Sequence, residues 1–133
     1  MSLSGGAPVR ALTVMATLVE KLGPVVPRES GERVLCAAYV SGAESSIGSA
    51  VIAVSDRQVL FAPRSAFLSR GAWRSRRLDE VRVEATTKRS MGLPVGQRFA
   101  VFDADGSPLT FEIGSRKDAK EFRKALARRL ITR

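Results

Sequence analysis

The chain has 133 residues, the length of one domain, and its 44% hydrophobic and 26% charged residues are typical of a protein that buries a single core. Lys and Arg number 22 against 13 Asp and Glu, and the resulting net charge of +9 favours anionic partners such as nucleic acid, lipid surfaces or acidic proteins. The sequence has no histidine and one cysteine, which excludes histidine-based triads, the usual zinc sites and an intrachain disulfide. That cysteine, Cys36, lies in an apolar run and is predicted to be a buried free thiol.

Residues 1–30 are predicted to precede the main domain as a polar tail, one helix and a proline-containing connector. Within residues 9–22, apolar side chains recur at helical spacing, which predicts a helix with one buried stripe that ends at Gly23-Pro24. The stripe consists of Leu12, Met15, Ala16, Val19 and Leu22. A secretory signal is the alternative, because Arg10 precedes a mostly apolar run, but two threonines interrupt it and Glu20-Lys21 follow it. No apolar stretch approaches the ~20 residues that a membrane-spanning helix needs.

Strand signals begin after the connector. Residues 32–40 alternate so as to place Val34, Cys36, Ala38 and Val40 on one face of a strand and Leu35, Ala37 and Tyr39 on the other. A polar loop at residues 41–46 follows. Residues 47–63, IGSAVIAVSDRQVLFAP, carry the clearest signal: two apolar runs flank Ser55-Asp56-Arg57-Gln58, whose Ser and Asp are suited to a turn. This segment is predicted to be a β-hairpin at the centre of a small sheet or barrel.

The next segment is basic and less regular. Residues 71–78 are predicted to form a strand. In residues 81–85, Val81, Val83 and Ala85 alternate with Arg82 and Glu84, the pattern of a half-buried strand. Residues 88–96 hold two Gly and one Pro and are predicted to be a loop.

The chain ends in a second hairpin and a helix. Residues 98–102 are predicted to pair with 109–113 across a turn rich in Asp and Gly. Ser115 is a predicted N-cap, with Asp118 at capping-box spacing. The buried stripe of the helix is predicted to be Ala119, Phe122, Ala125, Leu126 and Leu130. Its basic side, interpreted as a solvent-exposed face, holds Arg116, Lys117, Lys120, Arg123, Lys124 and Arg128.

About seven short strands followed by one amphipathic helix predict a mainly β fold with α, an antiparallel, partly open barrel that the C-terminal helix caps, with an added N-terminal helix. Four segments carry a family resemblance: Gly31-Glu32-Arg33-Val34, GSAVIAVSDRQVLF, Leu78-Asp79-Glu80-Val81, and the terminal KDAKEFRKAL. Together they resemble the bacterial pleckstrin-homology-like (PH-like) domains, which are related in pattern to GRAM domains. The resemblance covers residues 31–131, so residues 31–133 are expected to form the PH-like domain.

The resemblance implies a non-catalytic recognition module. In eukaryotic relatives, basic residues around the first-to-second strand loop hold phosphoinositide headgroups. The corresponding loop here, Ser41-Gly42-Ala43-Glu44-Ser45-Ser46, contains no Lys or Arg and one Glu. A phosphoinositide site is therefore not carried over to this chain.

Positive charge collects in two other places. Residues 64–98 hold nine basic residues against three acidic ones, and residues 115–133 hold eight against two. The candidate site for an anionic partner is Arg64, Arg70, Trp73, Arg74, Arg76, Arg77, Lys88 and Arg89. An exposed Trp73 among arginines would suit anionic lipid or single-stranded nucleic acid. Alternatively, Trp73 packs into the core; since strand parity puts it opposite Leu78, that requires an irregular strand.

Three functions follow from these patterns. The first is protein–protein interaction or self-assembly, with Leu12, Met15 and Val19 as the self-association residues. The second is peripheral binding to an anionic membrane, and the third and weakest is nonspecific nucleic-acid binding. No catalytic residue, cofactor or metal site is predicted, and Asp103 and Asp105 are interpreted as turn residues. The expected location is cytoplasmic, with the inner face of the membrane as the peripheral alternative.

Overall fold

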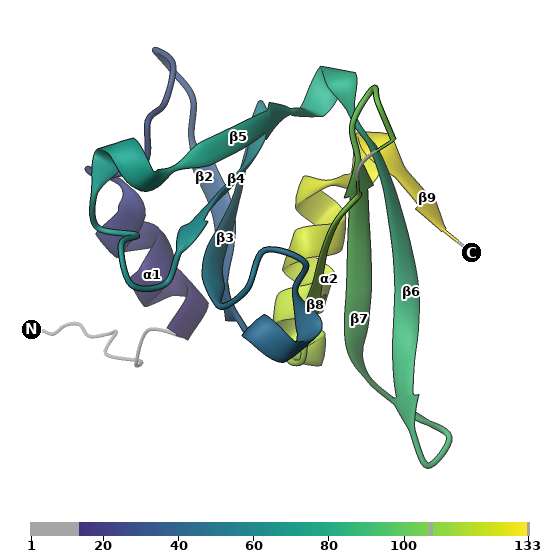
Figure 1. Cartoon of the computed structure of the whole chain (residues 1–133). Coiled ribbons are helices and arrows are strands. Elements are labelled where there is room, and N and C mark those ends of the chain that lie inside the picture. Colours follow the sequence, from purple (N-terminus) through teal and green to yellow (C-terminus); the bar gives the residue numbers. More distant parts are fainter. Residues whose placement is uncertain (1–13, 107, 133) are drawn as a thin grey trace, which may run out of the picture.

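The computed structural model describes residues 14–106 and 108–132, which form two four-stranded sheets and two α-helices (Figure 1). In chain order the elements are α1 (Val14–Leu22), β2 (Val34–Val40), β3 (Ala50–Ser55), β4 (Gln58–Pro63), β5 (Arg74–Arg77), β6 (Arg82–Ser90), β7 (Leu93–Phe102), β8 (Pro108–Ile113), α2 (Arg116–Ala125) and β9 (Leu130–Thr132). The first sheet has the order β2-β3-β4-β5 and the second β8-β7-β6-β9. Neighbouring strands are antiparallel except β9, which runs parallel to β6. The predicted mainly β architecture with helices is confirmed.

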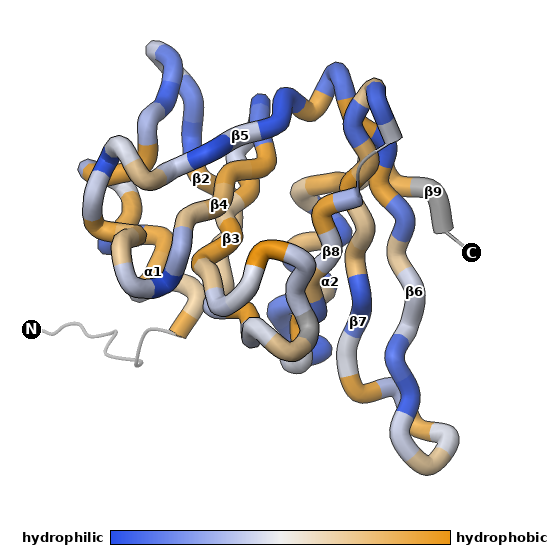
Figure 2. The backbone as a smooth tube through the Cα atoms, viewed as in Figure 1, coloured by the Kyte–Doolittle hydropathy of each residue, from blue (hydrophilic) through white to orange (hydrophobic). Residues whose placement is uncertain are grey.

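The central hairpin is confirmed as β3 and β4. Every residue of β3 is buried, and β3 pairs with β4 from Ala50↔Pro63 to Val54↔Val59. Ser55 closes the turn, because its Oγ accepts hydrogen bonds from the backbone N–H groups of Arg57 (3.0 Å) and Gln58 (2.9 Å). Figure 2 shows the apolar character of this hairpin beside the hydrophilic β5.

The predicted face assignment of β2 is wrong at Val34. The register skips Leu35, because Val34 lies opposite Ser55 and Cys36 opposite Val54. Such a bulge moves the preceding residue to the other face. Cys36 and Val40 therefore belong to one core cluster, whereas Val34 packs with Ala37 in the other.

The loop predicted at residues 88–96 is also wrong, because β6 and β7 continue through it as one long hairpin. Arg89 pairs with Pro94 and Ser90 with Leu93, and the turn between them is tight. Met91 (φ 52°) and Gly92 (φ 82°) both adopt left-handed backbone conformations, as a two-residue hairpin turn of this kind requires. Pro94 is tolerated because β8 ends opposite Gln97, so that β7 has one neighbour at this point.

The predicted strand at residues 71–78 is shortened to β5, which has four residues between two 3₁₀ turns, Arg70–Ala72 and Leu78–Glu80. The second predicted hairpin is confirmed, with β7 and β8 paired from Gln97↔Ile113 to Phe102↔Pro108. β6 buries Val83 and Ala85 in the predicted alternation.

The C-terminal helix is confirmed as α2, with the Ser115 Oγ accepting a hydrogen bond from the Asp118 N–H (3.2 Å). It buries Phe122 against Phe99 and Phe111 of the second sheet, with ring centroids 5.9–6.0 Å apart. Leu130 does not belong to the helix, contrary to the prediction. α2 ends at Ala125, a 3₁₀ turn follows, and Leu130 opens β9 beside β6.

α1 packs against β2 and contributes to both core clusters, through Met15 in the first and through Leu18 and Leu22 in the second. The predicted helix start and tail, including Leu12, lie outside the described residues. Among the described residues, no helix has the length and apolar content to cross a bilayer.

Candidate functional site

The predicted anionic-partner site is divided between two regions of the structure. Lys88 and Arg89 lie near the end of the β6–β7 hairpin, far from β5 in Figure 1. The other members lie in β5 or in the segment that leads into it: Arg64, Arg70, Trp73, Arg74, Arg76 and Arg77. The eight residues therefore do not line one continuous surface.

Trp73 packs inside the molecule. It is 8% exposed, belongs to the second core cluster, and its indole Nε1–H donates a hydrogen bond to the Phe67 carbonyl oxygen (2.8 Å). The strand is irregular here, because the 3₁₀ turn Arg70–Ala72 precedes Trp73. The Trp73 ring therefore packs in the core and is not exposed for contact with lipid or nucleic acid.

Two of the β5 arginines connect segments of the fold. Arg76 donates to the Val101 carbonyl oxygen (2.9 Å), and its Nη2 lies 3.6 Å from the Asp103 carboxylate, so it bridges the two sheets. Arg77 lies 2.8 Å from Glu29 and 3.5 Å from Asp79. These contacts give Arg76 and Arg77 a role in the architecture, whereas Arg70 and Arg74 are exposed. The Arg64 guanidinium lies 4.6 Å from the centre of the Tyr39 ring.

The predicted self-association residues on α1 contact the chain's own core. Met15 is 8% exposed, and Val19 is half-buried against both core clusters. Both also line a hollow between α1 and α2 together with Leu35 and Lys117. The apolar stripe of α1 is thus mostly covered within one copy of the chain.

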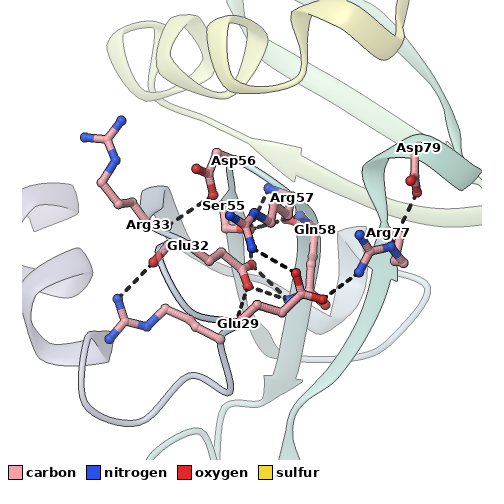
Figure 3. Close-up of polar contacts among 10 residues, drawn as sticks. Glu29, Glu32, Arg33, Ser55, Asp56, Arg57, Gln58, Arg77 and Asp79 are labelled. Carbon is pink, nitrogen blue, oxygen red and sulfur yellow. Dashed lines mark hydrogen bonds and ion pairs between the residues drawn. The ribbon is translucent and has the colours of Figure 1, made fainter.

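A buried carboxylate joins the N-terminal connector to the central hairpin (Figure 3). Glu32 is 3% exposed and accepts hydrogen bonds from the Ser55 hydroxyl, the Gln58 amide (2.9 and 3.0 Å) and the Glu29 N–H (2.8 Å). A buried carboxylate requires such donors, and this one has them. Because Ser55 is itself fully buried, the Ser–Glu pair closes the turn and presents no nucleophile to solvent.

Glu29 extends this cluster to the surface. Its carboxylate oxygens lie 3.0 Å from Arg57 and 2.8 Å from Arg77, and these contacts are drawn in Figure 3. The pKa of Glu29 is lowered, first by the hydrogen bond from Arg77 and then by that from Arg57. Connector, hairpin turn and β5 are thereby held together by polar contacts.

A concave site lies between α2 and the β6–β7 hairpin, and we call it the α2 groove. It has a volume of about 450 Å³. Its apolar lining comes from Pro94, Ala119, Ala127 and Leu130, and its cationic lining from Arg116, Lys120, Arg123 and Lys124; Thr87, Gly96 and Gln97 complete it. Among the described lining residues none is acidic, although Lys124 also lies 3.9 Å from Glu121.

The floor of the groove holds an unpaired acceptor. Gln97 is 8% exposed, and its Nε2 donates to the Thr87 hydroxyl (3.3 Å), but its Oε1 is buried without a hydrogen-bond partner among the described residues. A buried carbonyl oxygen without a donor is unfavourable. Because this oxygen is closed off from solvent, a ligand in the groove would be recognised by the cations and the apolar lining and not by Gln97.

Gly96, one of the residues that line the groove, allows a close approach between two strands. A side chain at Gly96 would place its Cβ 2.4 Å from the Ile113 carbonyl oxygen, so only glycine permits this approach of β7 to the end of β8. The register also skips Val95 at this point, since Lys88 pairs with Gly96 and Arg89 with Pro94. The resulting bulge bends the hairpin beside α2.

The sequence interpretation missed the groove. It assigned the basic side of the last helix to a solvated face and residues 88–96 to a loop, so the two walls were not connected. The available signal was the recurrence of basic residues at positions 116, 120, 123 and 124, which share one side of a helix. This pattern indicates a groove only once the β6–β7 hairpin is known to lie opposite this side of the helix.

No protein-family model matches this sequence, and a search of curated proteins finds no match. The function is therefore inferred from the geometry of the chain itself.

Proposed function

We propose that this chain is a non-catalytic PH-like binding domain that binds an acidic, extended segment of a partner protein in the α2 groove. The support for the PH-like assignment is the order of elements, in which the hairpin-connected strands of two sheets precede a helix that packs on the core. The observation that carries the function is the groove itself, in which four cationic side chains lie beside an apolar lining.

The edge of β6 favours an extended partner. β9 pairs with β6 at Val83, Glu84 and Ala85, while Thr87, further along the same edge, lines the groove. Backbone donors and acceptors at such an edge can pair with an added strand. A peptide lying along residues 86–90 of β6 would place its acidic side chains near α2.

Self-association through α1 is the less supported form of the interaction hypothesis, because Met15, Leu18 and Leu22 are already buried within the chain. Charge also favours a different molecule as partner, since a domain with a net charge of +9 repels its own copies.

The test is binding of two labelled decapeptides, one of alternating Glu and Val and one of alternating Lys and Val. The Glu peptide should bind and the Lys peptide should not. The double variant K120Q/R123Q should bind the Glu peptide about tenfold more weakly, which corresponds to ~1.4 kcal/mol. Added salt should weaken the wild-type complex through screening.

The matched control removes two charges outside the groove, in the variant R70Q/K117Q. Both side chains are exposed, and Lys117 lies on α2 itself but lines the hollow beside α1. Equal weakening by both double variants would show that only net charge matters and would contradict the proposal. NMR amide shifts at Thr87, Gln97 and Ala119 on peptide addition would locate the site directly.

A further inference from the structure

The end of the β6–β7 hairpin exposes large apolar side chains. Residues 86–93 are all exposed, and the hairpin extends away from the body of the molecule (Figure 1). Met91 is 99% exposed and Leu93 68% exposed. The other exposed large apolar side chains among the described residues, Val14, Leu68 and Leu35, lie in separate parts of the chain. We call residues 88–95 the hairpin tip. Its apolar side chains contribute nothing to the core and therefore need another explanation.

The tip has a defined shape. The ladder pairs Arg89↔Pro94 and Ser90↔Leu93 continue up to the turn. The Arg89 guanidinium donates a hydrogen bond to the Gly92 carbonyl oxygen (3.3 Å), which crosses the turn. Met91 and Leu93 are thus held outside the fold by a paired hairpin, so little ordering is required when they bind.

Positive charge surrounds these apolar side chains. From residue 85 to residue 101 the sequence contains Lys88, Arg89 and Arg98 and no acidic residue. The Glu112 carboxylate lies 2.6 Å from Lys88 and in a shorter contact with Arg98. Arg98 and Lys88 remain 61% and 46% exposed. Lys88, Arg89, Arg98 and Glu112 together carry a net positive charge, and they lie on the strands behind Met91 and Leu93.

We propose that the hairpin tip docks on an anionic membrane surface, with Met91 and Leu93 entering the boundary between headgroups and acyl chains. Lys88 and Arg89 would lie at the level of the anionic headgroups, and Arg98, opposite Thr86 and further from the turn, would add attraction from a greater distance. A protein partner is less favoured, because a stable interface buries about 800 Å² on each side and the tip is a narrow, convex hairpin. Two inserted side chains give weak, reversible binding.

The first experiment is sedimentation with vesicles of phosphatidylcholine containing 30 mol% phosphatidylglycerol, compared with pure phosphatidylcholine. Wild-type protein should bind the anionic vesicles only. The variant M91S/L93S should lose about fivefold or more of the bound fraction at fixed lipid, since it removes the apolar contact. The control L68S, at a residue 60% exposed on the β4–β5 connection, should bind like wild type.

The second experiment reports insertion directly. M91C can be labelled with an environment-sensitive dye, because the native Cys36 is fully buried and its burial raises the pKa of the thiol, which keeps it unreactive. Dye emission should rise and shift to the blue with anionic vesicles, and L68C should show no change. The groove variant K120Q/R123Q in the M91C background should give the same shift, which separates this proposal from the proposed function.

Three results would overturn the proposal. Wild-type protein that does not sediment with anionic vesicles at low salt excludes it. Undiminished binding by M91S/L93S would place the membrane contact on another basic surface. A dye at residue 91 that stays in water while the protein is bound would do the same. Thermal unfolding of each variant checks that the fold is retained, as expected for side chains with this exposure.

Discussion

The two long hairpins of this protein differ in strand composition and in their surroundings, since β3–β4 has no charged strand residue and β6–β7 has five. In β3–β4, one set of side chains, including Ile52 and Val54, packs in the first core cluster, and the other set, including Val51 and Leu60, packs in the second. In β6–β7, only the half near Val83 and Val101 is buried, and the other half extends into solvent (Figure 1).

The difference shows where the fold leaves room for a partner. The side chains of a hairpin covered on both faces stabilise the fold, so substitutions there change the free energy of unfolding. A hairpin that extends beyond the core can present side chains to other molecules, and β6–β7 supplies both the hairpin tip and the wall of the α2 groove opposite α2. Four substitutions should therefore separate effects on stability from effects on binding.

The largest effect is expected for L60A in β4. Leu60 is fully buried in the second cluster, and its truncation removes apolar contacts and leaves a cavity. The free energy of unfolding should fall by about 3 kcal/mol, measured by urea denaturation with circular dichroism. A loss below ~1 kcal/mol would mean that the cluster is less tightly packed than the structure shows.

The next effect is expected for G96A. The added Cβ would lie 2.4 Å from the Ile113 carbonyl oxygen, so β7 must shift away from β8. We expect a loss of about 2 kcal/mol in the same denaturation experiment, together with weaker binding of the Glu peptide. G71A is the control, because nothing lies within 4 Å of a Cβ built there. Equal behaviour of the two variants would contradict the close approach.

A smaller and pH-dependent effect is expected for E112Q in β8, beside the exposed half of the β6–β7 hairpin. The hydrogen bond from Lys88 is the main cause that lowers the pKa of Glu112, with Arg98 adding to it and burial opposing it. At pH 7 the variant should lose about 1 kcal/mol, a modest value because both cations are half-exposed.

The sign of the pH dependence follows from the lowered pKa. The ionised carboxylate stabilises the fold at pH values above the ordinary glutamate pKa of about 4.3, and this contribution disappears as the pH falls through the lower folded-state pKa. Wild type and E112Q should therefore converge in stability on acidification, as measured by urea midpoints at several pH values. A difference that stays constant down to pH 2 would exclude the ionised carboxylate as its source.

The smallest effect is expected for L93A, the matched leucine of the exposed hairpin. Leu93 is 68% exposed, so its truncation should change the free energy of unfolding by less than about 0.5 kcal/mol. Vesicle binding should nevertheless weaken. L60A is the same chemical change in the other hairpin, so the pair tests directly whether the two hairpins differ in their contribution to stability. A loss for L93A similar to that for L60A would contradict this difference.

Several elements were predictable because their signals are local. The β3–β4 turn lies at Asp56 and Arg57 and is closed by Ser55. The α2 cap lies at Ser115, and Leu109, Phe111 and Ile113 face the core as expected. Each signal depends on a period or a side-chain-to-backbone hydrogen bond within a few residues. The burial of Cys36 is of the same kind.

A mainly β domain with a terminal amphipathic helix follows from the amino-acid sequence, because apolar periodicity and turn chemistry are properties of short segments. Tertiary contacts were needed to show that Trp73 enters the core, that Val34 changes faces at a bulge, and that Pro94 and Gly96 belong to a strand. The tertiary structure also brings residues 116–127 opposite residues 87–97 to form the groove. The physical reason is that burial, register and concave shape depend on which distant strand or helix lies alongside, and a pattern within one segment does not contain that neighbour.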